Sequence, residues 1–317
     1  MNATLVTAAT TPVGRAIIEA LVADPSWGPV LAVAAEPESQ ARLPADPRIT
    51  YARVDLTRDR DVRRLLFGLA RELRIREIVH TPLHRRASER GRRVYALNVE
   101  STRGLLLLAE AQSNIERFVL RSTADVYRIE ADQPVIVDED HPLHLHTRMP
   151  QYLCDRVEAD ITVCTRTASP GLATAVLRCA EILAPDCGSQ LHDYLQSRVC
   201  FRPLGFDPMM HVMSVADAVR AVRLALVSQA RGVFNVPGKD ILPLSEIVAR
   251  VGRRGIAVPA PVLAPLYGLR GGILGTDFRY GLNHMRFHFS GVLDGRRAGK
   301  ELGYEPRVSV DFAGLLS

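Results

Sequence analysis

The sequence predicts an α/β fold built on a doubly wound parallel sheet, and the order of its apolar segments supports this prediction. Over the first 130 residues, short apolar runs alternate with stretches whose apolar residues recur at helical spacing. Such alternation is typical of parallel βαβ units. From about residue 185 the pattern breaks into shorter pieces. We therefore expect a sheet domain over residues 1–180 and a smaller lobe over 181–317 that interleaves with it.

Each expected strand is a short run of apolar, often β-branched residues. The runs lie at 3–8, 29–35, 49–55, 77–81, 117–122 and 173–180, and a strand-like piece follows at 232–238. Helical patterns cover 14–23, 59–73, about 92–112, 215–228 and 243–252. The helix at 92–112 contains "LLLLAEA", which is apolar nearly all round, so we expect this helix to be buried between the sheet and a partner.

The segment 258–291 has the least regular pattern in the chain. It combines glycine and proline with the apolar residues Leu263, Leu266, Tyr267, Ile273 and Leu274. Such a segment favours a substrate lid or a partner surface, and a well-packed lobe is the alternative.

Composition excludes several classes of protein. A hydrophobic content of 47% with 24% charged residues is typical of a folded globular chain, and no run approaches the roughly 20 apolar residues of a transmembrane segment. The first expected strand leaves no room for a signal peptide. The five cysteines lack metal-ligand spacing, so we expect free thiols and a cytoplasmic location.

The positive charge comes almost entirely from arginine. Lys239 and Lys300 are the only lysines, so 38 of the 40 basic residues are arginines, and the net charge of +5 does not by itself indicate nucleic acid. The loop at 84–93 carries five arginines against one glutamate. It is either a solvated loop or a capture site for an anionic small molecule or a protein partner. Nucleic acid is not favoured, because only Tyr95 adjoins the run.

A histidine cluster lies in the expected loop "EDHPLHLH". His141, His144 and His146 have no matched carboxylate, and the loop is broken by proline. We therefore predict no metal site.

The segment "VTAATTPVG" (6–14) has the outline of a dinucleotide-binding turn, with a strand, a tight loop and a helix. In such turns glycines allow the sharp turn, the approach of the pyrophosphate and the packing of helix on strand. Only Gly14, at the packing position, is a glycine here. Ala8 fits if its φ stays negative, whereas the β-branched side chain of Thr11 would stand where the pyrophosphate should lie.

Seven further segments, in order along the chain, resemble the extended short-chain dehydrogenase/reductases, the NAD-dependent epimerase/dehydratase family. They are "VDLTRDRDVRRLL" (54–66), "ALNVESTRGLLLLAEA" (96–111), "RFVLRSTADVY" (117–127), "VDEDHPL" (137–143), "YLCDR" (152–156), "GVFNVPG" (232–238) and "LDGRRAGKELGYEPR" (293–307). The resemblance implies a Rossmann-like domain that binds NAD or NADP, with a C-terminal lobe for the substrate.

The resemblance also implies a Ser/Thr–Tyr–Lys catalytic set. Its positions fall on Thr123, Tyr152 and Arg156, so an arginine replaces the lysine that would lower the pKa of the tyrosine. A planar guanidinium does not place the same hydrogen bonds as an ammonium. The catalytic step is therefore in doubt.

The family's cofactor positions are partly altered. They fall on Thr7, Ala8, Thr11, Val13, Gly14, Asp55, Leu56 and Asn98. The acidic residue expected after the second strand falls at about Ala34, and Glu36 lies two residues late. Asp55 and Asn98 are retained, and each is equally well explained as a local structural hydrogen-bonding residue.

Two functions remain open. Altered positions 8, 11, 34 and 156 favour a degenerate family member, a pseudoenzyme that acts in ligand binding, regulation or partner scaffolding and binds no dinucleotide. The alternative is an active NAD(P)-dependent oxidoreductase or epimerase with an atypical loop, acting on a nucleotide-sugar, sterol or lipid-like secondary alcohol. The resemblance also implies a homodimer formed through helices at about 92–112 and 150–168.

Overall fold

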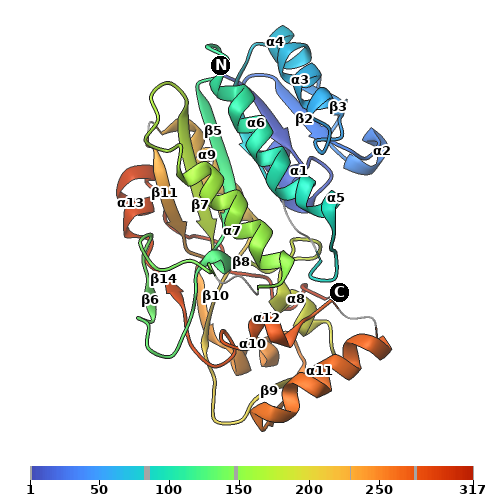
Figure 1. Cartoon of the computed structure of the whole chain (residues 1–317), viewed down its shortest axis with the longest axis vertical. Helices are drawn as coiled ribbons and strands as arrows, with labels where there is room; N and C mark the ends of the chain where they lie inside the picture. Colours follow the sequence, from blue (N-terminus) through green and yellow to red (C-terminus); the bar gives the residue numbers. More distant parts are fainter. Residues whose placement is uncertain (1, 82–85, 146–148, 229, 275–276, 317) are drawn as a thin grey trace.

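The computed structural model describes residues 2–316 except 82–85, 146–148, 229 and 275–276. Its centre is a seven-stranded parallel sheet in the order β11-β7-β5-β4-β1-β2-β3 (Figure 1). The strands are β1 (Ala3–Thr7), β2 (Val30–Ala34), β3 (Ile49–Arg53), β4 (Ile75–His80), β5 (Arg117–Thr123), β7 (Ala173–Cys179) and β11 (Gly232–Val236). This arrangement confirms the expected doubly wound parallel sheet.

Helices cover both faces of this sheet. One face packs on α1 (Pro12–Val22) and α9 (Val215–Val227), and the other packs on α3 (Asp59–Phe67) and α6 (Ser101–Glu110). Helix α7 (Gln151–Cys164) lies beside α6 (Figure 1). The short elements α2 (Glu38–Ala41), α4 (Leu69–Glu72), α5 (Arg92–Tyr95) and the π-helical turn η1 (Ala96–Glu100) complete this part, with a 3₁₀ turn η2 (Ala124–Val126) after β5.

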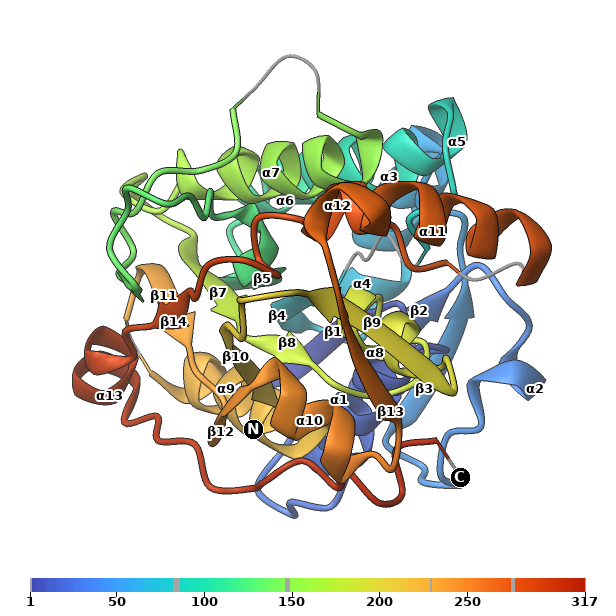
Figure 2. The ribbon, with the colours of Figure 1, turned by 90° about the horizontal axis from the view of Figure 1, so that it is seen from below.

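A smaller lobe lies below the carboxyl ends of the strands (Figures 1 and 2). It contains a sheet of β8 (Glu181–Ile182), β10 (Met209–Met213) and β12 (Asp240–Pro243), and the pairs β9 (Val199–Pro203) with β13 (Arg254–Val258) and β6 (Ile136–Val137) with β14 (Val292–Leu293). Its helices are α8 (Gln190–Leu195), α10 (Leu244–Arg250), α11 (Ala260–Leu274) and α12 (Tyr280–Asn283), whereas α13 (Arg296–Leu302) packs against β11 and α9 of the large sheet. The chain interleaves, because α9 and β11 return to the large sheet.

The segment 258–291 is more regular than expected. Residues 260–274 form helix α11, with Pro265 inside it. Leu263 and Tyr267 are buried in the core of the lobe, and the Tyr267 hydroxyl donates to the Phe201 carbonyl oxygen at 2.9 Å. At these two residues the segment has the packing of the alternative, a well-packed lobe, and its proline and glycine residues lie in a helix that packs on β9. The side chains of Ile273 and Leu274 lie outside the described residues.

The leucine run of α6 is buried on three of its four side chains. Leu105, Leu106 and Leu108 pack into the core, whereas 45% of Leu107 is exposed. Leu107 faces a groove between α6 and α7. Among the described residues, no helix is both long and apolar enough to cross a membrane.

Candidate functional site

The loop between β1 and α1 closes on itself through Thr11, the N-cap of the helix. The Thr11 hydroxyl donates to the Ala8 carbonyl oxygen at 2.7 Å and accepts from the Gly14 amide at 3.0 Å. Only 5% of Thr11 is exposed, so its side chain lies inside the loop. We had expected it to stand where the pyrophosphate should lie. Gly14 makes the expected close contact, because a Cβ there would lie 2.2 Å from the Ala8 oxygen.

The start of α1 has few unbonded amides. The first four N–H groups of a helix have no partner within the helix and can bind an anion. Here the amide of the N-cap Thr11 donates to the Ala8 carbonyl oxygen at 2.9 Å, Pro12 has no N–H, and the Gly14 amide donates to the Thr11 hydroxyl. Within the described part of the chain, Val13 alone of these four keeps an N–H without an acceptor. A pyrophosphate needs several convergent amides, so this loop does not fit that group.

Ala8 adopts a backbone conformation that favours glycine. Its φ is +53°, in the left-handed region, so the condition of a negative φ, under which an alanine fits this turn, is not met. A side chain in this region costs about 1 kcal/mol. The position therefore keeps the backbone conformation of a glycine turn although the glycine is gone.

The first loop is also tied to the end of β2. The Thr10 hydroxyl donates to a Glu36 carboxylate oxygen at 3.0 Å, and the Tyr51 hydroxyl donates to the Glu36 carbonyl oxygen at 2.7 Å. Glu36 therefore bridges the loops after β1 and β2, beyond Ala34 at the end of the strand.

Thr7 links β1 to β4. Its hydroxyl lies 3.0 Å from His80 Nδ1 and accepts from the Thr81 amide at 3.0 Å. Burial lowers the pKa of His80 to about 3, so the imidazole is neutral and acts as a hydrogen-bonding group of the core. Thr7 is consequently engaged within the protein.

The retained cofactor positions also make local contacts. The Asp55 carboxylate accepts from the amide and hydroxyl of Thr57 at 3.1 and 2.7 Å. Burial raises the pKa of Asp55, but these hydrogen bonds outweigh it and the pKa is lowered. Leu56 beside it is buried, and the Asn98 amide donates to the Val94 carbonyl oxygen at 2.8 Å. Asp55 and Asn98 therefore both make local hydrogen bonds, and their part in cofactor binding stays a prediction.

Tyr152 and Thr123 occupy the expected catalytic positions on α7 and at the end of β5. The Tyr152 side chain is buried, and its hydroxyl donates to the Gly188 carbonyl oxygen at 2.7 Å. Burial raises the pKa of this phenol well above its usual value of 10. The Thr123 hydroxyl accepts from the Asp125 amide at 3.2 Å. A general base near neutral pH needs the opposite shift.

Arg156 shares a hydrogen-bond acceptor, the Gly188 carbonyl oxygen, with Tyr152. Its guanidinium lies over the Tyr152 ring, 3.9 Å from the ring centre, and donates to the Gly188 carbonyl oxygen at 2.9 Å. It also forms a buried ion pair with Asp125. The arginine therefore contacts the ring and its hydrogen-bond partner.

Asp125 connects α7 to the smaller lobe. Its second oxygen lies 2.7 Å from Arg286, which also pairs with Glu181 at 2.7 Å. Glu181 in turn accepts from the Ser189 hydroxyl at 2.7 Å. Sequence reasoning missed this network, although Asp125 lies within the quoted "RSTADVY" and Glu181, the first residue of β8, lies two residues after the end of β7.

The basic loop is exposed where it is described. Arg86 lies 3.6 Å from Asp277, and the Gly91 amide donates to the Gln151 side chain at 2.8 Å. Arg90, Arg92 and Arg93 are exposed; the loop residues 84 and 85 lie outside the described residues.

No cluster of three metal-ligating side chains occurs in the part of the chain that the structure describes. His141 lies 2.8 Å from the Arg128 carbonyl oxygen through Nε2. His146 lies outside the described residues.

Asp193 makes stability depend on pH near neutrality. Burial, together with the nearby carboxylates Asp277 and Glu181, raises the pKa of this carboxyl to about 7. The folded protein then binds more protons than the unfolded chain between about pH 4 and pH 7, so its stability falls as the pH rises through this window.

We expect Asp193→Asn to reduce this fall. Urea unfolding at pH 5 and pH 8 should show a smaller loss of stability in Asp193→Asn than in the natural protein. Asp132→Asn, at an exposed aspartate, serves as the control. Equal losses in all three proteins would contradict the assignment.

The model of the NAD dependent epimerase/dehydratase family matches residues 4–236. The chain belongs to this family. Among its curated relatives is the uncharacterized protein Rv0501 of Mycobacterium tuberculosis. The two sequences are 27% identical over 310 residues, which cover 96% of this chain and 80% of the relative.

Solved structures share the fold of this family member. The dTDP-glucose 4,6-dehydratase of Bacillus anthracis in complex with NAD matches with a TM-score of 0.70 at 16% identity, covering 100% of this chain and 94% of that one. The UDP-glucose 4-epimerase of Thermotoga maritima with UDP-glucose matches with a TM-score of 0.71 at 17% identity, covering 100% and 96%. At this level of identity the match shows the fold alone.

Proposed function

We propose that this family member binds a ligand or partner without the tyrosine-dependent hydride transfer that the family resemblance implies. The observation that carries the proposal is the state of Tyr152. Its hydroxyl is buried and donates to Gly188, while Arg156 lies against its ring and pairs with Asp125. The closed loop at the start of α1 supports the same function, because it offers few amides to a cofactor.

The titration of Tyr152 tests the proposal. A catalytic tyrosine must form phenolate near neutral pH, whereas burial raises the pKa of this phenol. We expect the ultraviolet difference between the natural protein and Tyr152→Phe to show no phenolate below pH 9. Tyr304→Phe, at a second buried tyrosine, is the matched control. A phenolate that appears near pH 7 and is absent only from Tyr152→Phe would contradict the proposal.

An active NAD(P)-dependent oxidoreductase or epimerase is the second candidate. It is favoured by the family itself and by the presence of a tyrosine and a cation at residues 152 and 156. Native mass spectrometry of the purified protein distinguishes the two functions. A dinucleotide that remains bound through purification would support the active enzyme.

We also propose that the chain forms a homodimer through α6 and α7. The groove between these helices has a volume of about 540 Å³ and is lined by Leu106, Leu107, Val157 and Ile161 together with polar groups. A second copy would cover the exposed part of Leu107. Stable interfaces bury roughly 1,200–2,000 Å² in total, so the dimer would need this area across the two helix pairs.

Light scattering at micromolar concentration tests this assembly. We expect a dimer for the natural protein and a monomer for Leu107→Glu, because the new carboxylate would be buried in the interface. Phe67→Glu, at an exposed residue of α3, should remain dimeric. A monomeric natural protein would exclude this interface.

A further inference from the structure

Arg121 is a buried cation without a partner. It lies in β5, and only 4% of it is exposed. Its Nε is buried without an acceptor, and no hydrogen bond or ion pair joins its guanidinium to any residue among those the structure describes. A buried, unpaired charge is strongly unfavourable in a folded protein, and arginine does not lose its proton.

Arg117, four residues earlier on the same strand, is a buried arginine whose guanidinium has hydrogen-bond acceptors. It is also 4% exposed, and its guanidinium donates to the carbonyl oxygens of Ala225 and Ala230 at 3.0 and 3.2 Å. The two arginines lie on one face of the strand, because side chains two and four residues apart share a face. The two arginines therefore differ in their hydrogen-bond acceptors, which Arg117 has and Arg121 lacks.

The described groups that act most strongly on Arg121 carry no negative charge near pH 7. The thiols of Cys179 and Cys187 and the phenol of Tyr152 are among the groups that act on it, and the Arg156 guanidinium adds a second positive charge. Burial raises the pKa of both thiols to about 11, so they are neutral near pH 7.

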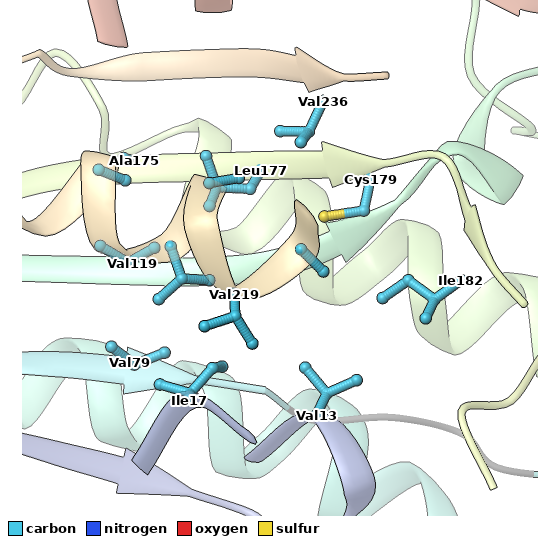
Figure 3. Packing of buried hydrophobic residues seen from close by; sticks show 14 of the residues in the cluster. Val13, Ile17, Val79, Val119, Ala175, Leu177, Cys179, Ile182, Val219 and Val236 are labelled. Atoms are coloured by element: carbon cyan, nitrogen blue, oxygen red, sulfur yellow. The ribbon is translucent and has the colours of Figure 1, made fainter. Parts of the chain in front are cut away.

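Arg121 lies near the carboxyl end of β5, two residues before the last residue of the strand. Val119 and Cys179 point into the layer between the sheet and helices α1 and α9, as Figure 3 shows, and Arg121 follows Val119 by two residues toward the carboxyl end of β5. Ligands of open α/β sheets bind outside the carboxyl ends of the strands.

We infer that Arg121 anchors an oxyanion-binding site at the carboxyl end of β5, which takes a phosphate or carboxylate group of a small ligand. An oxyanion supplies the missing counter-charge and accepts from the guanidinium in a bidentate manner. This inference deepens the ligand-binding role proposed above by naming the chemical class of the ligand. It does not require Tyr152 to be inactive.

Thermal unfolding in the presence and absence of anions tests the site. The probes are inorganic phosphate, pyrophosphate, citrate and NAD, each compared with sodium chloride at the same ionic strength. The proteins are the natural chain, Arg121→Met, Arg121→Lys and Arg117→Met. The natural chain should gain a few degrees in Tm with at least one phosphate or carboxylate probe.

Arg121→Met should behave in the opposite way to Arg117→Met. Without anions, Arg121→Met should have a higher Tm than the natural chain, because an unpaired buried charge is removed, and it should lose the anion-dependent rise. Arg117→Met should have a lower Tm, because two carbonyl oxygens lose their donor, but should keep the anion-dependent rise. Arg121→Lys should keep part of this rise.

The response to NAD identifies the source of the oxyanion. A rise with phosphate, pyrophosphate or citrate but not NAD, lost in Arg121→Met, supports the site and a ligand other than a dinucleotide, which we expect. A rise with NAD that is lost in Arg121→Met supports the site with a dinucleotide as its source. The inference is overturned if no probe raises the Tm of the natural chain, if Arg121→Met responds like the natural chain, or if it is destabilised as Arg117→Met is.

Discussion

Replacing Asp125 with alanine should lower the free energy of unfolding by about 3–5 kcal/mol. The carboxylate is 7% exposed and pairs with Arg156 and Arg286 at once. Its removal leaves two guanidinium groups without that partner, and charges that are left uncompensated in a protein interior are costly. Urea unfolding at pH 7, followed by circular dichroism, measures the loss.

Glu246→Ala is the matched control, because it breaks an ion pair on the surface. Glu246 and Arg250 lie 2.9 Å apart on α10 and are both half exposed, so the expected loss is about 0.5 kcal/mol or less. If Asp125→Ala lost no more stability than this control, the network would not be a connection between α7 and the smaller lobe.

The stabilisation by Asp125 should also depend on pH in a defined direction. Burial raises the pKa of this carboxyl, but Arg286 and Arg156 outweigh burial and the folded-state pKa is lowered. A lowered pKa means that the stabilisation is complete above the unfolded-state value near 4 and is lost as the pH falls through the folded-state value. The natural protein and Asp125→Ala should therefore converge in stability only under strongly acidic conditions.

The sheet could be predicted from the sequence because its strands are buried on both faces. Runs such as "VLAVA" in β2 are apolar throughout, and the helices between them show helical spacing. Helix α11 could not be predicted in this way. Among its described side chains, only Leu263 and Tyr267 are buried, and Pro265 suggests a break that the helix accommodates.

The candidate site was only partly predictable. The sequence predicted that Thr123, Tyr152 and Arg156 occupy the catalytic positions of the family. It did not predict the hydrogen bonds and ion pairs that these side chains form. Asp125, Glu181 and Arg286 come from three distant parts of the chain, and their ion pairs depend on how the lobe folds back. Arg121 and Arg286 could not be predicted as special residues, because the chain has 36 other arginines and neither composition nor spacing distinguishes these two from them.

The second large effect that we expect concerns dinucleotide binding, and it depends on the loop between β1 and α1. A ligand at about 100 times its Kd stabilises a fold by roughly 2.7 kcal/mol, which thermal unfolding detects. We expect no such stabilisation of the natural protein by millimolar NAD(H) or NADP(H), because the Thr11 hydroxyl holds the Gly14 amide and little of the helix N-terminus remains for phosphate.

The double variant Ala8→Gly/Thr11→Gly should recover part of this stabilisation. Glycine adopts the positive φ of residue 8 without strain. Loss of the Thr11 hydroxyl leaves the Gly14 amide free to donate to a ligand. The two changes have opposite effects on stability without a ligand, about 1 kcal/mol or less each, so the fold should survive. Adding Arg156→Lys should then be needed before Tyr152 acts near neutral pH.

Ala8→Gly/Thr10→Gly is the matched control for the loop. It carries the same change at residue 8 and removes a neighbouring hydroxyl that bonds to Glu36 and not to Gly14. It should therefore bind dinucleotide no better than Ala8→Gly alone, whereas the Thr11 variant should bind better than both. Micromolar binding of a dinucleotide by the unmodified protein would show that the closed loop opens at little cost. In that case the active-enzyme function would replace the one proposed here.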